Sequence, residues 1–220
     1  MTTTRPCIIF DLDGTLAYTI EDLKNSINRM CDHFGWPNIT VEDALRNINS
    51  GARAFVRGCM PEDLRKNNEA ADRAYEVYAA IYQEEHLKTT CLYPFVAEGL
   101  HYLREQGVRM AVFSNKNDEQ TKAICQKLIP PGTFELVLGY DGTYPHKPSP
   151  EGALAIAAHF KAKAEDVILV GDSDVDMNLA ANAGMRPVGV SWGYRPPELL
   201  RSLGAERILS SLEDIKALID

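Results

Sequence analysis

The sequence lacks most of what a secreted, disulfide-bonded or membrane-spanning protein needs. Its five cysteines, at positions 7, 31, 59, 91 and 125, are widely spaced and form no C-x-x-C pair. This spacing favours reduced thiols over a disulfide framework or a zinc site. No apolar run approaches the ~20 residues of a transmembrane helix. The first residues lack the apolar core and small-residue cleavage site of a secretion signal, so we expect a cytoplasmic protein with no membrane partner.

Basic residues are also scarce relative to acidic ones. The chain has 23 Lys and Arg against 31 Asp and Glu, which gives a formal net charge of −8. Non-specific nucleic-acid binding needs a basic surface, so we expect no nucleic-acid partner. Any site for an anion must therefore be built locally from a few cations, backbone N–H groups or a metal. With 220 residues, 45% of them hydrophobic, the chain is large and apolar enough to bury a core.

The spacing of apolar residues predicts a parallel α/β sheet interrupted by a helical insertion. Residues 7–10 form a short apolar run typical of a buried strand, and helical spacing then continues from Ile20 to about His86. After Thr90 strands and helices alternate, which indicates a Rossmann-like parallel sheet with helices on both faces. We expect residues 1–16 and 90–220 to form this core, and residues 17–89 to form a small all-helical domain. Later strands are predicted at Val108–Phe113, Leu136–Leu138, Val167–Val170, Pro187–Val190 and Arg207–Leu209.

Two helix starts carry recognisable capping signals. Thr19 followed three residues later by Asp22 resembles a capping box for the first helix of the insertion. Asp174 is the candidate for the N-cap of the helix after the Val167–Val170 strand. Both expectations assign a structural role to an acidic residue near a helix start.

Ligands of parallel sheets bind at the carboxyl ends of the strands, so the residues after each strand are candidates for chemistry. Asp11 and Asp13 follow the first strand, and two such carboxylates repel unless a cation or proton lies between them. The alternative for this pair is an acidic turn. Ser114 and Asn115 follow the second strand, where a hydroxyl and N–H groups suit a phosphate oxygen, although both residues are common in loops.

Two further clusters follow the same logic. Lys147 precedes a predicted helix, and it is either a fixed cation beside the Asp pair or an ordinary solvated lysine. Asp172, Asp174 and Asp176 follow another apolar strand, and three carboxylates this close need a metal or a lysine to offset them.

Taken together, these clusters resemble the four motifs of the haloacid dehalogenase superfamily of phosphohydrolases. The order is Asp-x-Asp, Ser, Lys and Gly-Asp-x-x-x-Asp, each at a predicted strand end. The helical insertion after the first motif is similar to the small cap domain of that superfamily's first cap class. The resemblance covers nearly the whole chain. Segments similar to phosphoglycolate phosphatases are residues 49–56, Leu92-Tyr93-Pro94, Lys147-Pro148-Ser149-Pro150 and Val190-Ser191-Trp192-Gly193-Tyr194.

The resemblance implies roles for the motif residues in phosphoryl transfer. Asp11 is implied as the nucleophile that forms an aspartyl-phosphate, and Asp13 as the general acid and base. Ser114 and Lys147 are implied to hold the transferring phosphoryl group.

The resemblance also implies Mg²⁺ as the cofactor. It would be held by the Asp11 carboxylate, the Asp13 backbone carbonyl and the Asp172 carboxylate. Asp176 would support the metal's water ligands or hold Lys147. Mn²⁺ accepts the same oxygen ligands, so the choice between the two metals stays open.

Substrate contacts are implied on both sides of the site. The implied substrate-binding residues are Thr15 and Asn115 in the core and Ser50, Gly51 and Arg53 in the cap. Arg53 either pairs with a substrate carboxylate through its planar fork or forms a surface ion pair. The sequence departs from the usual first motif at Ala17-Tyr18-Thr19, which leaves open whether the bulky Tyr18 faces the substrate.

The implied activity is Mg²⁺-dependent hydrolysis of a small phosphorylated metabolite, most closely that of phosphoglycolate phosphatases, which convert 2-phosphoglycolate to glycolate and phosphate. The alternatives are a phosphatase for another small phosphate, namely a nucleotide, a sugar phosphate or pyrophosphate, or a β-phosphoglucomutase-like phosphotransferase. A non-catalytic regulator is disfavoured because Asp11, Asp13, Lys147 and Asp172 are all present. The sequence does not decide between a monomer and a homodimer.

Overall fold

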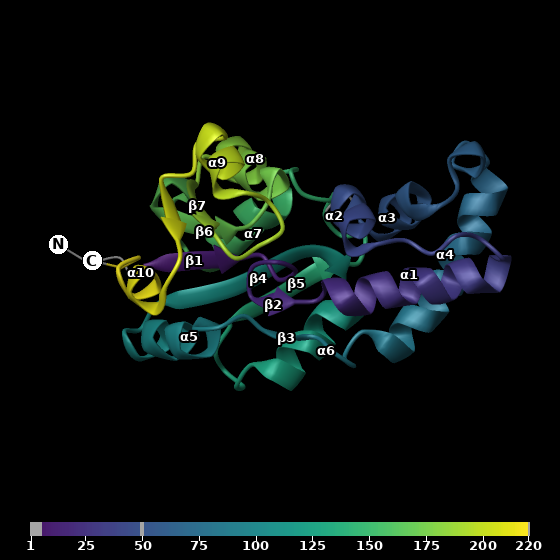
Figure 1. Cartoon of the computed structure of the whole chain (residues 1–220). Helices are drawn as coiled ribbons and strands as arrows, with labels where there is room; N and C mark the ends of the chain where they lie inside the picture. The colour runs from purple at the N-terminus through teal and green to yellow at the C-terminus, as the bar shows by residue number, and fades with distance from the viewer. Residues whose placement is uncertain (1–5, 49–50, 220) are drawn as a thin grey trace. The chain divides into compact units, whose positions relative to one another are not determined.

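The computed structural model describes residues 6–48 and 51–219, which form two compact units (Figure 1). The α/β unit comprises the described parts of residues 1–17 and 92–220, and the helical unit comprises residues 18–91. Within the described residues, no helix has both the length and the apolar character needed to cross a membrane. All five cysteines are free, and Cys91 is the exposed one.

A six-stranded sheet forms the centre of the α/β unit. Its order is β5-β4-β1-β6-β7-β8, and every neighbouring pair is parallel. This confirms the predicted α/β fold with a parallel sheet. The strands are β1 (Cys7–Phe10), β4 (Arg109–Asn117), β5 (Leu136–Tyr140), β6 (Val167–Gly171), β7 (Arg186–Val190) and β8 (Arg207–Leu209).

Helices cover both faces of this sheet, and β1 is buried on each. Cys7 and Ile9 pack in a core with residues of α7 and α8, whereas Phe10 on the other face lines a small cavity together with residues of α5 and α10. A strand covered on both sides reads as a continuous apolar run, which is why residues 7–10 show no alternation. The helices are α5 (Val96–Glu105), α6 (Asp118–Leu128), α7 (Glu151–His159), α8 (Asp174–Ala183), α9 (Pro197–Ser202) and α10 (Leu212–Lys216), with a short 3₁₀ helix η2 (Ala164–Asp166).

The helical unit is built on α1 and α4, which pack against each other, with α3 against α4. Its aromatic residues Phe55, Tyr78 and Tyr82 are buried and pack ring against ring. The elements are α1 (Ile20–Phe34), α2 (Val41–Asn47), α3 (Ala52–Cys59), η1 (Glu62–Leu64) and α4 (Asn68–Glu85). Two short strands, β2 (Ala17–Tyr18) and β3 (Cys91–Leu92), pair where the chain passes between the units.

The predicted capping box at Thr19 and Asp22 is wrong. Thr19 makes no side-chain capping hydrogen bond, because its backbone is already helical (φ −114°, ψ −8°) rather than extended as an N-cap requires. Asp22 instead accepts hydrogen bonds from Thr89 and Thr90. These come from the two backbone N–H groups, at 3.0 and 2.9 Å, and the two hydroxyls, at 2.6 and 2.8 Å. Asp22 therefore fastens the last residues of the helical unit to its first helix.

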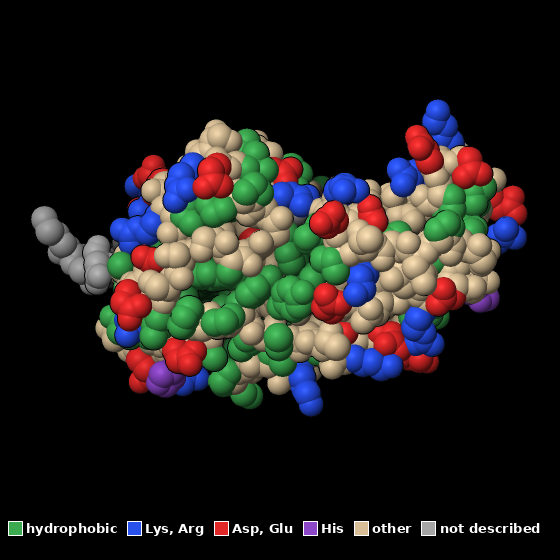
Figure 2. All heavy atoms as spheres, viewed as in Figure 1, with side chains coloured by type: hydrophobic (Ala, Val, Ile, Leu, Met, Phe, Trp, Pro, Cys, Tyr) green, Lys and Arg blue, Asp and Glu red, His purple; other side chains and the backbone are tan. Residues whose placement is uncertain are grey.

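Charged side chains of both signs are interspersed on the face of the molecule drawn in Figure 2.

Candidate active site

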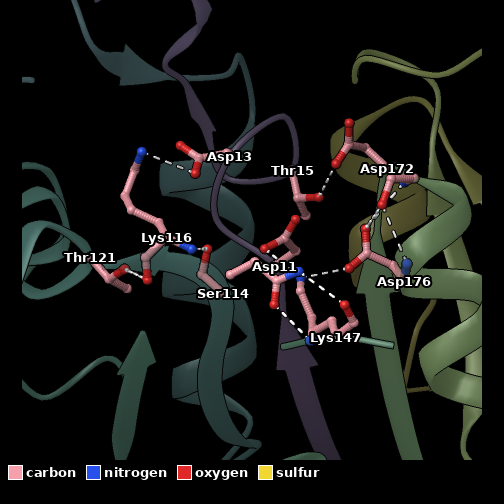
Figure 3. Close-up of polar contacts among 11 residues, drawn as sticks. Asp11, Asp13, Thr15, Ser114, Lys116, Thr121, Lys147, Asp172 and Asp176 are labelled. Carbon is pink, nitrogen blue, oxygen red and sulfur yellow. Dashed lines mark hydrogen bonds and ion pairs between the residues drawn. The ribbon is translucent and has the colours of Figure 1, made fainter. Parts of the chain in front are cut away.

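The candidate site lies where three adjacent strands end (Figure 3). Phe10 at the end of β1 is in register with Val112 of β4 and Val170 of β6, so the residues just beyond these three positions meet at one edge of the sheet. The strand β4 itself continues to Asn117, so Ser114 and Asn115 lie in its last residues and not after it as predicted. Asp11 continues this pairing by donating its N–H to the Val170 carbonyl at 2.9 Å. Because β1 is central, its carboxylates lie between the loops of both neighbouring strands.

Lys147 connects two of the predicted carboxylates. Its Nζ lies 2.8 Å from Asp11 Oδ1 and 2.7 Å from Asp176 Oδ1, and all three side chains are at least 90% buried. Burial by itself lowers the pKa of Lys147, but Asp11 and Asp176 outweigh it and raise the pKa above its ordinary value. Of the two readings of this lysine, the structure therefore shows the fixed cation.

Ser114 and Asn115 lie at the same edge, and Asn115 has a local role. Its amide Nδ2 donates to the Lys147 carbonyl at 3.1 Å, and its Oδ1 accepts from the Lys147 N–H at 2.7 Å. This pair of hydrogen bonds fixes the backbone that carries Lys147. Ser114 is buried, and its Oγ accepts from the Lys116 N–H at 3.3 Å.

Asp172 is enclosed by two loops. Thr15 donates its hydroxyl to Asp172 Oδ1 at 3.2 Å, and the Tyr194 N–H donates to Oδ2 at 2.7 Å. Trp192 joins the two loops through Nε1, which donates to the Thr15 carbonyl at 3.0 Å. A Cβ at Gly193 would lie 2.1 Å from the Asp172 Cβ, so only glycine fits this approach. The sequence predicts Thr15 as a substrate-binding residue and places Trp192 and Tyr194 in a segment similar to phosphoglycolate phosphatases, but it assigns none of the three to Asp172.

The predicted N-cap at Asp174 is also wrong. The N-cap of α8 is Ser173, whose Oγ accepts from the Asp176 N–H, while the Asp176 carboxylate accepts from the Ser173 N–H. The serine has the extended backbone of a cap, whereas Asp174 is already the first helical residue. Asp176 therefore uses Oδ2 to cap the helix and Oδ1 to bind Lys147.

The donor set fits a divalent cation. Asp11, Asp172 and Asp176 are buried, and each offers an oxygen within 4.8 Å of the other two. Burial, opposed by Lys147 and reinforced by Asp176, raises the pKa of Asp11 to about 7. Burial and the charges of Asp176 and Asp11 likewise raise the pKa of Asp172 well above its ordinary value. The cluster therefore favours additional positive charge, and hard oxygen ligands are those that Mg²⁺ binds.

Asp13 has a cationic partner that sequence reasoning did not assign. Lys116 Nζ lies 3.1 Å from Asp13 Oδ2, with the two side chains 4% and 14% exposed (Figure 3). The available signal was the lysine two residues beyond Ser114, at a strand end already singled out.

The predicted cap residues belong to the helical unit. Arg53 Nη1 lies 2.7 Å from Asp72 Oδ1, and its guanidinium lies over the Tyr75 ring at 4.2 Å, with both charged side chains well exposed. Gly51 precedes α3 with a φ of 83°, and Ser50 lies outside the described residues. The contact of Arg53 with substrate stays a prediction, as does that of Gly51.

The chain is similar to known proteins over most of its length. The family model of haloacid dehalogenase-like hydrolases matches residues 8–190. A phosphoglycolate phosphatase of Pseudomonas putida is 29% identical over 96% of this chain and 78% of its own, and one of Nitrosococcus oceani is 29% identical over 96% and 95%. A Haemophilus somnus crystal structure, described as a predicted phosphoglycolate phosphatase, matches with a TM-score of 0.90 and 26% identity over the full length of both chains.

The chain therefore belongs to the haloacid dehalogenase-like hydrolase family. It is an enzyme, a phosphatase with the α/β fold of this family and an acidic cluster suited to a divalent metal.

Proposed function

We propose that the protein is a Mg²⁺-dependent phosphomonoester hydrolase that acts through an aspartyl-phosphate on Asp11, with 2-phosphoglycolate as its substrate. The observation that carries the proposal is the buried cluster in which Lys147 bridges Asp11 and Asp176 beside Asp172. The choice of substrate is supported by relatives named phosphoglycolate phosphatase that align with 96% of the chain.

The chemistry proceeds in two steps. An Asp11 oxygen attacks phosphorus and the ester P–O bond breaks, while Asp13 gives a proton to the leaving oxygen. Asp13 then takes a proton from water, whose oxygen attacks the phosphoryl group and frees the Asp11 carboxylate and inorganic phosphate. Ser114 and Lys147 hold the phosphoryl oxygens during both steps.

Mg²⁺ would be held by the carboxylates of Asp11 and Asp172 and the backbone carbonyl of Asp13. When bound, it offsets the negative charge that otherwise keeps an anionic ester away from a carboxylate nucleophile. Asp176 keeps Lys147 in place through their 2.7 Å contact, and Thr15 and Tyr194 orient the Asp172 carboxylate.

The helical unit is proposed to act as a cap that selects the leaving group. Its contribution would come from the start of α3, at Gly51 and Arg53, and from the preceding Ser50. For Arg53 to bind a substrate carboxylate, its guanidinium would have to exchange Asp72 for the ligand.

The test is phosphate release from a substrate panel with and without Mg²⁺. The panel contains 2-phosphoglycolate, sugar phosphates, nucleotides, pyrophosphate and p-nitrophenyl phosphate. We expect Mg²⁺-dependent turnover with the highest kcat/KM for 2-phosphoglycolate. Similar weak activity on every ester would contradict the substrate but not the mechanism, and no turnover of any ester would contradict the proposed reaction.

A further inference from the structure

Lys116 is a nearly buried cation beside the proposed general acid. Its side chain is 4% exposed, and its Nζ contacts Asp13 Oδ2 at 3.1 Å. Lysine is rarely buried unless its charge is paired, so this position is unusual for a strand-end lysine. Figure 3 shows the Lys116–Asp13 pair apart from Lys147, which contacts Asp11 and Asp176. The two lysines therefore form ion pairs with different carboxylates.

The backbone of Lys116 is fixed on both sides. Its N–H donates to Ser114 Oγ at 3.3 Å, and its carbonyl accepts from the buried Thr121 hydroxyl at 3.3 Å. Thr121 also donates to the Asn117 carbonyl at 2.9 Å. Gly139 allows this packing, since a Cβ there would lie 2.6 Å from Thr121 Oγ1. These contacts hold the backbone of Lys116, and the ion pair with Asp13 directs its ammonium into the site.

The chemistry of the leaving group brings it close to this ammonium. Asp13 can protonate the leaving oxygen only from within hydrogen-bond distance. In 2-phosphoglycolate the carboxylate is one methylene away from that oxygen, so it must lie near Asp13. Asp13 becomes a carboxylate as it gives up this proton, so it and the substrate carboxylate then repel each other, and a cation that contacts both relieves this repulsion. An ammonium has three donors and can contact two acceptors at once.

We propose that Lys116 binds the carboxylate of the leaving group. It thereby makes the enzyme selective for phosphate esters of 2-hydroxy acids over phosphate esters of uncharged alcohols of the same size. This inference rests on the proposed function and deepens it. It assigns the contact to the α/β unit, where the chemistry takes place, rather than to Arg53. Lys116 is then a specificity-determining residue in direct contact with substrate.

The test compares two substrates of nearly equal size, 2-phosphoglycolate and 2-hydroxyethyl phosphate, with Mg²⁺ present. The variants are Lys116→Met, which keeps the length of the side chain and removes its charge, and Lys122→Met as the matched control. Lys122 pairs with Asp118 on α6 and is half exposed. Arg53→Ala is measured alongside, and circular dichroism checks that each variant is folded.

We expect Lys116→Met to raise KM for 2-phosphoglycolate by about 10- to 100-fold, the size of a lost hydrogen bond to a charged group. Any loss that arises through Asp13 should be shared by 2-hydroxyethyl phosphate, so the increase in KM should be larger for 2-phosphoglycolate than for this ester. Lys122→Met should match the wild type on both substrates.

Three results would overturn the inference. Equal losses on both esters, mainly in kcat, would show that Lys116 acts only through Asp13. Preserved selectivity in Lys116→Met would exclude the contact, and loss of selectivity in Arg53→Ala alone would assign it to the cap. The wild-type enzyme is measured on both esters before any variant. A wild-type enzyme that does not prefer 2-phosphoglycolate would contradict the proposed substrate itself.

Discussion

Asp22 in the helical unit and Asp11 in the α/β unit are both buried carboxylates, 1% and 7% exposed, yet their environments are opposite. Burial raises the pKa of Asp22, but hydrogen bonds from Thr89 and Thr90 outweigh it and hold the pKa below its ordinary value. Burial also raises the pKa of Asp11, and there the single Lys147 does not compensate, so the pKa reaches about 7.

This difference shows that burial alone does not identify a functional carboxylate. Asp22 has a complete set of four donors from one short segment, and nothing more is needed for its charge to be stable. Asp11 shares Lys147 with Asp176 and lies beside Asp172, so the charge of the cluster is left uncompensated. Groups whose pKa is perturbed in this way are candidates for catalysis and metal binding.

The most direct test of this difference removes the charge of each aspartate in turn. Asp11→Asn should lower kcat for p-nitrophenyl phosphate with Mg²⁺ by about 10⁴-fold or more, because the amide is not a nucleophile. Asp22→Asn should leave kcat per folded molecule within a few-fold of the wild type. Retained activity in Asp11→Asn would contradict its assignment as the nucleophile.

Asp13→Asn tests the second carboxylate of the first motif. We expect kcat to fall by about 10²- to 10⁴-fold for 2-phosphoglycolate, whose alkoxide leaving group needs a proton. The first step with p-nitrophenyl phosphate should be affected less, because nitrophenolate leaves without one. Rapid-quench measurement of p-nitrophenol release compares the two esters, and an equal loss in the first step of both would argue against an acid role.

The stability of the helical unit should depend more on its buried Asp22 than on an exposed carboxylate. Asp22→Asn should lower the free energy of unfolding by about 3 kcal/mol, since it places an amide against buried N–H and hydroxyl donors. The control is Asp72→Asn, at the exposed ion pair with Arg53, where we expect a loss of less than about 1 kcal/mol. Urea denaturation measures both, and equal losses would contradict the structural role assigned to Asp22.

The smallest expected effect is on the stability of the metal-free protein as a function of pH. Asp22 and Asp11 should contribute to this dependence with opposite sign. The folded pKa of Asp22 lies below its unfolded value of about 3.9, so its stabilisation is present at neutral pH and is lost on acidification below about pH 4. Asp11 has a folded pKa of about 7, so the folded state binds more protons and stability falls as pH rises from about 4 to 7.

Because the carboxylates of the cluster titrate together, this fall is a property of the cluster and not of Asp11 alone. Unfolding of wild type and Asp11→Asn in a chelator between pH 4.5 and 7.5 measures it. The stability of the wild type relative to Asp11→Asn should decline with pH and recover when Mg²⁺ is added. A pH-independent difference would contradict the assigned origin of the raised pKa.

The sequence was sufficient for the sheet and for the motif residues at its edge. Short apolar runs such as residues 7–10 identify buried strands, and parallel pairing brings the residues after them together. The contacts that distinguish Asp22 from Asp11 could not be predicted from such local patterns. Asp22 meets Thr89 across 67 positions, and a local pattern suggested a helix cap instead.

The second cation was missed for a similar reason. β4 extends to Asn117 through Ser114 and Lys116, which do not read as strand residues, so the position of Lys116 beside Asp13 depends on tertiary structure. The Tyr194 N–H that binds Asp172 is a backbone group, and no residue type in the sequence encodes it.

The central claim is that Asp11 receives the phosphoryl group, and mass spectrometry of the protein during turnover tests it most directly. Asp13→Asn with p-nitrophenyl phosphate and Mg²⁺ should still form the intermediate but hydrolyse it slowly, because the base that activates water is gone. After acid quenching, we predict one phosphoryl group that is removed by hydroxylamine and maps to the peptide containing Asp11. A hydroxylamine-resistant group on Ser114, or turnover with no phosphorylated protein at any time, would contradict the account.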